Sequence, residues 1–311
     1  MKTQLPLCCP CSLKSKLSRV EGGFICKSEQ CEHSQIYSLF PVLNNIPVLV
    51  SEKRCDTVCT EGRMESYIER PKASYSKIKN FLVGTSNITK SNCNLFVKEL
   101  ISTNERPKVL VIGSGLRGSG TEELWNNKKI ELHGIDIYGS TSVDIVCDAH
   151  YLPLKDNYYD GVWIQAVLEH VLEPSVVVSE IHRVLRKSGL VYAETPFMQQ
   201  VHEGAYDFTR FTVLGHRYLF RNFESISIGG NKGPELVFAW SMRYLIWSIT
   251  KSRLIGRIFG LLTGLLMRPI SYFVSKPSMY DASSGVFFLG RKTIRNTVSH
   301  KEVVRLYAGQ M

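Results

Sequence analysis

The sequence predicts an α/β protein in which a doubly wound, mainly parallel sheet follows a small cysteine-rich module and precedes a helical cap. Three observations predict this class. Strand and helix signals alternate from residue 107 to about 230, five cysteines fall within the first 31 residues, and a long apolar and basic segment follows residue 230. Strands that alternate with helices favour a parallel sheet covered on both faces. A ligand is then expected at the carboxyl ends of the strands.

The composition is that of an ordinary globular chain, except for its charge. The 311 residues can bury a large core and form one full domain with smaller additions. The net charge of +10 favours anionic partners such as nucleic acid, membrane headgroups or phosphorylated substrates. Nine cysteines are too few for a disulfide scaffold, and the N-terminus lacks the apolar core of a signal peptide. We therefore expect a cytoplasmic protein.

Residues 1–50 are predicted to form a zinc-ribbon-like module. Two thiolates three positions apart can grip one tetrahedral zinc ion from a tight turn, and a second pair completes the site. The expected ligands of this structural zinc are Cys8, Cys11, Cys26 and Cys31. The second spacing is loose, so His33 competes with Cys31, and Cys9 could replace Cys8 only by shifting the turn. The alternative is a set of free cysteines. Two short apolar runs divided by an Asn-Asn turn, "IYSLFPVLNNIPVLV", close the module.

Residues 51–105 are predicted to be a linker with lead-in helices, around 64–83 and 93–101. The segment is polar and mixed in charge, and it carries no chemical motif.

Residues 106–311 are predicted to form the main domain, and "VLVIGSGLRGSG" (109–120) lies near its start. An apolar strand runs there into a glycine-rich turn and a helix N-terminus, which suits a nucleotide-like ligand. The helix from Pro174 is expected to end at Gly189, because cations precede that glycine. The expected strands are 108–113, 131–137, 160–166, 190–196 and 283–292, and the expected helices are 121–127 and 174–189.

The cofactor is not decided by the glycines alone. Their spacing, G-x-G-x-x-G, matches the dinucleotide fingerprint. Asp136, 18 residues beyond Gly118, ends the second strand. A carboxylate there can bind both ribose hydroxyls, which fits NAD and S-adenosylmethionine equally.

The next segment, "DIVCDAHYLPLKDNYYDGVWIQAVLEHV" (144–171), separates the two cofactors. It places Asp148-Ala149, Leu152-Pro153, Asp160 and the "LEHV" of 168–171 in an order that resembles the class I S-adenosylmethionine-dependent methyltransferases, particularly their small-molecule members. The resemblance covers residues 107–215 and implies a Rossmann-like fold, S-adenosylmethionine as cofactor and methyl transfer as activity. The match to the NAD fingerprint is then a coincidence of glycine spacing.

The resemblance also implies roles for individual residues. The glycine loop passes under the methionine part of the cofactor, Asp136 holds the ribose, and Asp148 accepts from the adenine amine. The implied cofactor-binding residues are Gly113, Ser114, Gly115, Asp136, Ile137, Asp148, Ala149 and Gln165. Two positions depart from the family, since Val111 stands where an acidic residue is common and Arg117 where the third glycine is expected.

Because the cofactor is already activated, the protein mainly aligns the acceptor and removes its proton. A hydroxyl acceptor therefore benefits from a base. The polar stretch "QVHEGAYDFTRFT" (200–212) follows the strand at 190–196, where a substrate would lie. The candidate catalytic residues are His202, His170, Tyr206 and Asp207, with His202 first. Asp207 and Arg210 could instead form a structural ion pair. Relatives that bind a divalent ion do so through E-x-x-E-H, and Ala166 occupies the first of these positions, so we expect no catalytic metal. His182 and His216 are expected at the surface or in packing.

An insertion at residues 235–276 is predicted to be helical. Its segment 241–276 has six Lys or Arg and no Asp or Glu, and its longest uncharged apolar run is half a bilayer span, so we expect it not to cross a membrane. As one continuous helix it would hold five cations within about 160° of arc, which suits an anionic membrane surface. The alternative is a cap of core helices over the substrate pocket with a solvated basic edge. Gly256, Gly260 and Gly264 either permit close helix contact or mark breaks.

The expected function is S-adenosylmethionine-dependent methylation of a hydroxyl on a small or lipid-linked polar acceptor, such as a sugar in glycan or natural-product biosynthesis. The expected partners are that acceptor and, peripherally, the inner face of an anionic membrane. An RNA methyltransferase whose zinc module binds substrate is a second hypothesis, disfavoured because the excess charge lies largely on an apolar segment. A non-catalytic cofactor-binding partner protein is a third.

Overall fold

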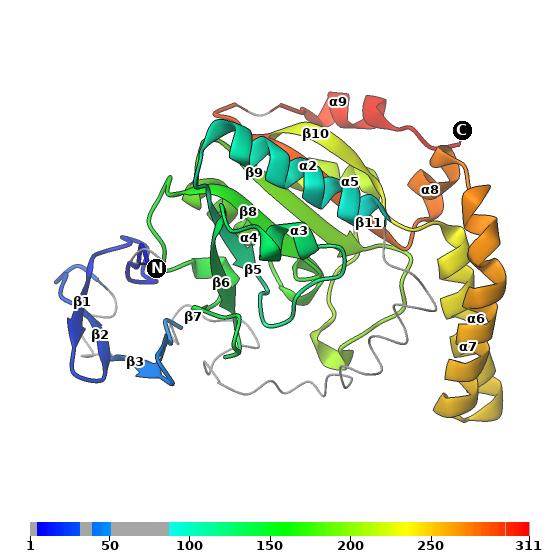
Figure 1. Cartoon of the computed structure of the whole chain (residues 1–311), viewed down its shortest axis with the longest axis horizontal. Helices are drawn as coiled ribbons and strands as arrows, with labels where there is room; N and C mark the ends of the chain where they lie inside the picture. The colour runs from blue at the N-terminus through cyan, green and yellow to red at the C-terminus, as the bar shows by residue number, and fades with distance from the viewer. Residues whose placement is uncertain (1–4, 32–38, 51–86, 296, 311) are drawn as a thin grey trace.

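A seven-stranded sheet forms the centre of the protein (Figure 1). The computed structural model describes residues 5–31, 39–50, 87–295 and 297–310. The strands lie in the order β10-β11-β9-β8-β5-β6-β7. Strands β5 to β9 pair in parallel, and β11 runs antiparallel to both of its neighbours. The mainly parallel sheet expected from the sequence is confirmed. The strands are β5 (Lys108–Ile112), β6 (Glu131–Asp136), β7 (Ile145–Val146), β8 (Tyr159–Gln165), β9 (Leu185–Pro196), β10 (Phe223–Gly230) and β11 (Gly285–Lys292).

Helices cover both faces of the sheet. On one face, Val109 and Val111 of β5 join a buried cluster with α2 (Asn87–Thr103) and α3 (Glu122–Asn126). On the other face, Leu110 and Ile112 join a cluster with α4 (Pro174–Val184) and the residues that follow α5 (Val213–Leu219). Burial on both sides explains why β5 is a continuous apolar run. Because the chain leaves β5 toward β6 and later returns to its other side with β8, the strand order switches at β5, where such sheets bind ligands.

Helix α4 ends earlier than the sequence suggests. The expected stop at Gly189 is wrong, because the helix ends at Val184 and the chain continues directly as β9. Leu185 pairs with Tyr159 of β8, and both side chains are fully buried. The Val184 carbonyl accepts the Tyr158 N–H at 2.8 Å. Long-range strand pairing therefore outweighs the local helix signal.

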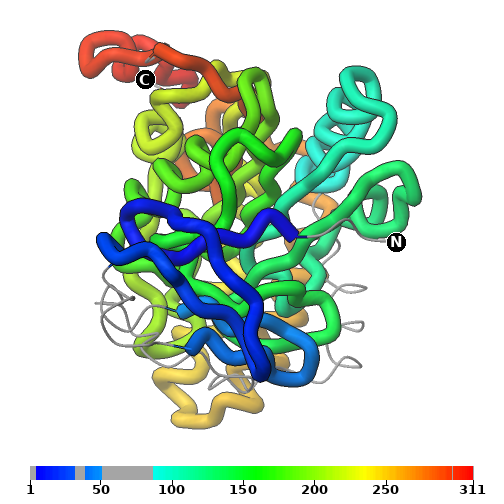
Figure 2. Tube along the Cα trace, turned by 90° about the vertical axis from the view of Figure 1, so that its left-hand side faces the viewer, coloured from blue at the N-terminus to red at the C-terminus, as the bar shows by residue number. Residues whose placement is uncertain are grey.

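The N-terminal module is a small antiparallel sheet of four strands, β1 (Leu17–Val20), β2 (Gly23–Cys26), β3 (Phe40–Leu43) and β4 (Ile46–Pro47). Asn44 and Asn45 turn the chain between β3 and β4 with φ of 50° and 65°, as the Asn-Asn signal predicts. Figure 2 shows the module, in blue, lying across one end of the molecule. There Val48 bridges Val146 in parallel, and the Leu49 N–H donates to the Val146 carbonyl at 2.8 Å. The module thus covers the β7 edge of the large sheet. His33 and the stretch 64–83 lie outside the described residues.

The C-terminal region contains a helical hairpin, α6 (Pro234–Thr250) and α7 (Arg253–Met267), which stands at the side of the sheet (Figure 1). The chain turns at Lys251, whose φ is 56°, so the segment is not one continuous helix and the common arc of cations does not form. A Cβ on Gly256 would lie 2.7 Å from the Arg243 carbonyl oxygen, and one on Gly260 2.7 Å from the Arg243 Cβ. These glycines therefore allow close helix contact. The remaining elements are η5 (Arg268–Tyr272), α8 (Lys276–Ala282), α9 (His300–Val303), η6 (Val304–Leu306), η2 (Ala149–Tyr151), η3 (Leu168–His170) and η4 (Gly204–Tyr206).

Candidate functional site

The turn after β5 favours glycine at position 113 for two reasons, its backbone conformation and the lack of room for a side chain. Gly113 has a φ of 78°, which favours glycine. A Cβ at this position would lie 2.2 Å from Val167 Cγ2. The N–H groups of Gly113 and Ser114 both donate to the Ile135 carbonyl, at 2.9 and 3.0 Å. The turn is therefore packed between β6 and the residues that follow β8.

Asp136 joins the glycine turn to the end of β6. Its Oδ2 accepts the Gly115 N–H at 2.7 Å, and its Oδ1 accepts the Ile137 N–H at 2.7 Å. These bonds hold the carboxylate at the carboxyl end of the strand, where it lines a cavity of about 550 Å³. This volume lies in the range of small-molecule sites, roughly 300–1,000 Å³.

Asp148 lines the same cavity from the next loop. Its side chain is largely buried, and its Oδ1 accepts from the His150 N–H at 2.8 Å and lies 2.6 Å from His150 Nδ1. The structure therefore brings the two expected carboxylates to one cavity, 12 positions apart in the sequence. The other expected cofactor residues that line it are Gly113, Ile137, Ala149 and Gln165.

Two of the expected cofactor residues lie behind the cavity wall instead. The Ser114 side chain is fully buried beneath Gly134, where an added Cβ would lie 2.6 Å from Ser114 Oγ. The Ser114 side chain therefore packs beneath Gly134 and does not line the cavity. Gly115 acts through its hydrogen bond to Asp136.

A second cavity of about 300 Å³ adjoins the first, and the two share Ser119, Gln165 and Ala166 as lining residues. Ala166 follows β8 with a φ of 54°, a left-handed conformation that is uncommon for a residue with a Cβ. Such backbone strain is concentrated at functional sites. The carboxyl end of β8 thus separates a larger chamber, which contains the two carboxylates, from a smaller one.

His202 lines the smaller cavity and lies between two carboxylates. Its Nε2 is 3.6 Å from Glu169 Oε1, its Nδ1 is 3.3 Å from Asp207 Oδ2, and its backbone N–H donates to that same oxygen at 2.8 Å. Burial lowers the pKa of His202, but contact with Glu169 and the charges of Asp207 and Glu203 outweigh it, so that the pKa is raised. The imidazole is therefore placed to take up a proton.

His170 lies beside His202, with ring centroids 4.8 Å apart. Its Nδ1 is 2.5 Å from the Tyr206 carbonyl oxygen, and since a carbonyl only accepts, we assign the proton to Nδ1. The other nitrogen, Nε2, then points its lone pair toward carboxylate oxygens of Glu203 and Glu169, at 3.6 and 3.7 Å. Carboxylate and imidazole groups therefore crowd together around Glu169. Tyr206 contributes its carbonyl to this arrangement.

Glu169, His170 and His202 offer three ligand atoms that lie within 4.8 Å of one another. Glu169 is fully buried, and neither of its carboxylate oxygens has a hydrogen-bond partner among the described residues. Imidazole and carboxylate ligands suit divalent transition ions. These three residues differ from the E-x-x-E-H set, whose first position is occupied by Ala166.

Asp207 and Arg210 form the ion pair that the sequence suggested. Arg210 Nη2 donates to Asp207 Oδ2 at 2.5 Å, and its Nη1 contacts Oδ1. Burial raises the pKa of Asp207, but the bonds from Arg210 and from the His202 N–H outweigh it, so that the pKa is lowered. The pair therefore fixes the loop and also holds Asp207 against His202. His216 is buried beside Phe220, where burial lowers its pKa to about 3, and it packs as expected.

Glu194 is a site residue that sequence reasoning missed. It lines the smaller cavity, and its Oε2 accepts from Thr89 Oγ1 at 2.8 Å and from Tyr192 Oη at 2.6 Å. Its Oε1 accepts from Asn231 Nδ2 at 2.6 Å. Burial raises the pKa of Glu194 despite these donors. The signal available in the sequence was an acidic residue inside the apolar strand "LVYAETP". Glu169, inside "LEHV", was missed in the same way.

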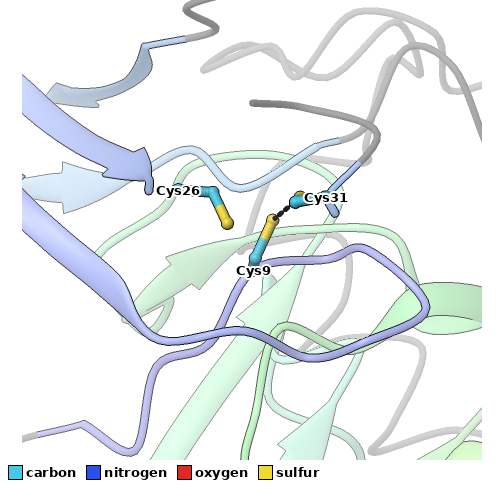
Figure 3. Close-up of side chains that lie close together, drawn as sticks. All are labelled: Cys9, Cys26 and Cys31. Atoms are coloured by element: carbon cyan, nitrogen blue, oxygen red, sulfur yellow. Dashed lines mark hydrogen bonds between the residues drawn. The ribbon is translucent and has the colours of Figure 1, made fainter. Parts of the chain in front are cut away.

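The cysteines of the N-terminal module form a separate cluster. The Sγ atoms of Cys9, Cys26 and Cys31 lie within 4.8 Å of one another, and those of Cys9 and Cys31 are 3.6 Å apart (Figure 3). Around tetrahedral zinc, bonds of about 2.3 Å place sulfurs about 3.8 Å apart, so the spacing fits. Burial raises the pKa of Cys11, but the Ser15 backbone and the Cys31 and Cys9 side chains outweigh it and lower the pKa, which places Cys11 beside this cluster.

The cysteine cluster differs by one residue from the ligand set predicted from the sequence, because it contains Cys9 where Cys8 was expected. Cys8 lies outside the cluster, and its N–H donates to the Pro153 carbonyl of the main domain at 2.9 Å. Burial raises the pKa of Cys8 to about 11, although Lys14 lowers it. Cys8 is therefore buried against the main domain, whereas Cys9 lies in the cluster.

One family model matches part of the chain. Residues 110–193 match the family described as "Methyltransferase domain", which supports a class I methyltransferase domain over that segment. No curated protein matches the sequence.

Solved structures resemble the chain only in part. The [4+2]-cyclase SpnF is 17% identical over 66% of this chain and 82% of its own, with a TM-score of 0.40. A putative sarcosine dimethylglycine methyltransferase from Galdieria sulphuraria is 13% identical over 71% and 98%, with a TM-score of 0.43. An S-adenosylmethionine-dependent methyltransferase from Archaeoglobus fulgidus is 19% identical over 70% and 99%, with a TM-score of 0.44. The methyltransferase assignment therefore depends on the family match and the site.

Proposed function

We propose that this protein transfers a methyl group from S-adenosylmethionine to a hydroxyl of a polar acceptor. The observation that carries the proposal is the pair of cavities that meet at Ser119, Gln165 and Ala166. The larger contains the two carboxylates that suit a nucleoside, and the smaller contains a histidine set between carboxylates. A donor and an acceptor bound in adjoining chambers react at the shared wall.

The larger cavity fits the cofactor by the chemistry of its donors and acceptors. Asp136 is placed to accept from ribose hydroxyls and Asp148 from an adenine amine. Gly113 has no side chain, which leaves open the space beside Val167. When bound there, the sulfonium cofactor supplies an activated methyl group.

His202 is the proposed base for the acceptor hydroxyl. Its raised pKa means that it can accept the proton released when the hydroxyl oxygen is methylated. Asp207, itself held by Arg210, lies 3.3 Å from Nδ1 and orients the ring. Glu169 lies 3.6 Å from Nε2 and stabilises the imidazolium that results. The hydrogen bond from His170 Nδ1 to the Tyr206 carbonyl holds the loop that carries His202.

The smaller cavity supports a sugar-like acceptor. Its polar lining includes Glu194, Gln199, His202 and Asn231, which can bond to hydroxyls. Leu236 and Trp240, near the start of α6, add apolar surface. Most side chains of this lining are polar, so an acceptor with several hydroxyls can bond to more than one of them. A free sugar and a lipid-linked one share this chemistry.

We also propose that the cysteine cluster holds a structural zinc ion. Cys9, Cys11, Cys26 and Cys31 belong to the buried core that includes the sheet face under α4. Zinc bound by four thiolates would tie the two halves of the module together where it covers β7.

The test is incubation of the purified protein with methyl-labelled cofactor and fractionated cell extract. Label in soluble glycan or in glycolipid would support the proposal. Label in RNA, removed by ribonuclease, would favour the RNA alternative that the +10 charge allows. Cofactor binding without transfer to any fraction would favour a non-catalytic partner protein.

A further inference from the structure

We propose that helix α7 docks into the interfacial layer of an anionic lipid bilayer, lying in the membrane plane with its apolar face toward the acyl chains. This inference concerns membrane binding alone and does not require methyl transfer.

The exposed apolar side chains of the protein are concentrated on the hairpin and the turn that follows it. Of the 25 large hydrophobic side chains that are exposed among the described residues, 13 lie between positions 238 and 273. They are Phe238, Leu245, Ile249, Leu254, Ile255, Ile258, Phe259, Leu262, Leu265, Leu266, Ile270, Tyr272 and Phe273. A contiguous exposed patch of this kind marks a surface that is covered in use.

The apolar side chains of α7 share one face, and this face points away from the protein. At ~100° per residue, the seven exposed apolar residues of α7 between Leu254 and Leu266 fall within about 140° of arc. Gly256, Gly260 and Gly264 lie on the opposite side of the helix, where they face α6. The described residues leave each of these seven side chains at least 40% exposed.

The charges beside this face select an anionic partner. Segment 241–276 carries six cations and no acidic residue. Arg253 and Arg257 are exposed on α7 near the tip of the hairpin. At ~100° per residue, Arg257 falls about 60° beyond the apolar face, and Arg253 lies on the side toward α6, where its guanidinium stands 5.0 Å from the Trp247 ring centroid. A second copy of this chain would bring the same cations together, whereas anionic headgroups would neutralise them. An apolar face flanked by Lys and Arg is the pattern of helices that bind at the membrane interface.

The attachment of α6 favours a helix that lies on the membrane over one that crosses it. By length and composition, residues 253–272 could span a bilayer. However, Leu236 and Ala239 are buried against the body, and Tyr244 Oη donates to the Val201 carbonyl at 3.2 Å. With α6 fixed in this way, crossing would carry Lys251 and Arg253 at the tip through hydrocarbon, which is costly.

Membrane docking would also bring the acceptor site to the lipid surface. Leu236 and Trp240, from the first turns of α6, line the smaller cavity. Gln200, beside His202, donates to Ser241 Oγ at 3.1 Å. If the proposed function holds, the acceptor is then a polar headgroup presented by a lipid.

The test is flotation of the full-length protein with two kinds of vesicle. One contains phosphatidylcholine alone, and in the other about one lipid in three is the anionic lipid phosphatidylglycerol. We expect binding to the anionic vesicles that weakens with salt. The triple variant Ile258→Ser, Leu262→Ser and Leu266→Ser should lose at least about 100-fold in partition. Arg253→Gln with Arg257→Gln should lose about 25-fold on anionic vesicles only, since each cation contributes roughly fivefold.

A matched control replaces three exposed apolar residues outside the hairpin, Ile294, Val304 and Leu306, with serine. It should bind as the wild type does, and circular dichroism should show all variants folded. The proposal is overturned if the wild-type protein ignores anionic vesicles, or if the hairpin triple variant binds as well as the control. It is also overturned if sedimentation shows a dimer that the triple variant abolishes without any vesicle binding, or if membrane-bound protein resists alkaline carbonate. Loss of methyl transfer with intact vesicle binding would instead count against the proposed function alone.

Discussion

Replacement of Gly113 by alanine should damage the larger cavity by two separable effects. The backbone at Gly113 has a φ of 78°, and an L-residue there costs about 1–2 kcal/mol. The new Cβ would also lie 2.2 Å from Val167 Cγ2, and such overpacking costs about 1–3 kcal/mol. Since Val167 lines the cavity, its displacement should also weaken binding of S-adenosylmethionine. We expect a loss of about 2–5 kcal/mol in the free energy of unfolding, measured by urea denaturation.

Gly204 provides the control for the backbone effect. Its φ is 63°, but a Cβ there would meet nothing within 4 Å. Gly204→Ala should therefore cost only the backbone part, about 1–2 kcal/mol. Adding Val167→Ala to Gly113→Ala should recover most of the steric part, as a double-mutant cycle would show. Equal losses for Gly113→Ala and Gly204→Ala would refute the close packing of this turn.

The remaining predictions concern the proposed base and the two clusters of potential metal ligands. His202→Gln should lower the rate of methyl transfer about 10²- to 10⁴-fold while calorimetry shows unchanged cofactor binding; an unchanged rate would exclude His202 as base. Because His202 accepts a proton only when neutral and its pKa is raised, activity should be low at acidic pH and rise through a pKa above that of an ordinary histidine. Glu169→Gln removes a carboxylate that raises this pKa and should move the rise to lower pH; a shift to higher pH would contradict the assignment. Treatment with a metal chelator should leave the rate of methyl transfer unchanged. A loss of rate that an added divalent ion restores would mean instead that Glu169, His170 and His202 bind a metal ion. Cys9→Ser should lower the zinc content of the purified protein well below one per chain, and Cys8→Ser should leave it unchanged; the reverse result would restore Cys8 as the ligand.

Local patterns in the sequence were sufficient for the sheet and for several of its turns. The apolar run of β5 followed by Gly113 predicts a buried strand and a glycine-rich turn, and both are present, with Gly113 at a φ of 78°. Asn44 and Asn45 predict a hairpin turn for the same reason, since both residues tolerate positive φ. These features depend on residues that are adjacent in the chain.

Features that depend on distant contacts were not predictable. Helix α4 ends at Val184 because Leu185 pairs with Tyr159, 26 residues earlier. The C-x-x-C spacing favours Cys8, whereas the cluster contains Cys9, and the backbone of Cys8 bonds to the distant Pro153 carbonyl. The distance between Glu169 and His202 depends on how the loop after β9 returns to β8. Sequence reasoning therefore found the loop that carries His202 but not its buried carboxylate partner.

Calorimetric titration with S-adenosylmethionine tests the central claim most directly. The account predicts that the wild-type protein binds the cofactor, and that Asp136→Ala and Asp148→Ala each lose about 10- to 100-fold in affinity, the cost of a hydrogen bond to a charged group. Variants that bind as tightly as the wild type, or a wild-type protein that does not bind at all, would contradict it.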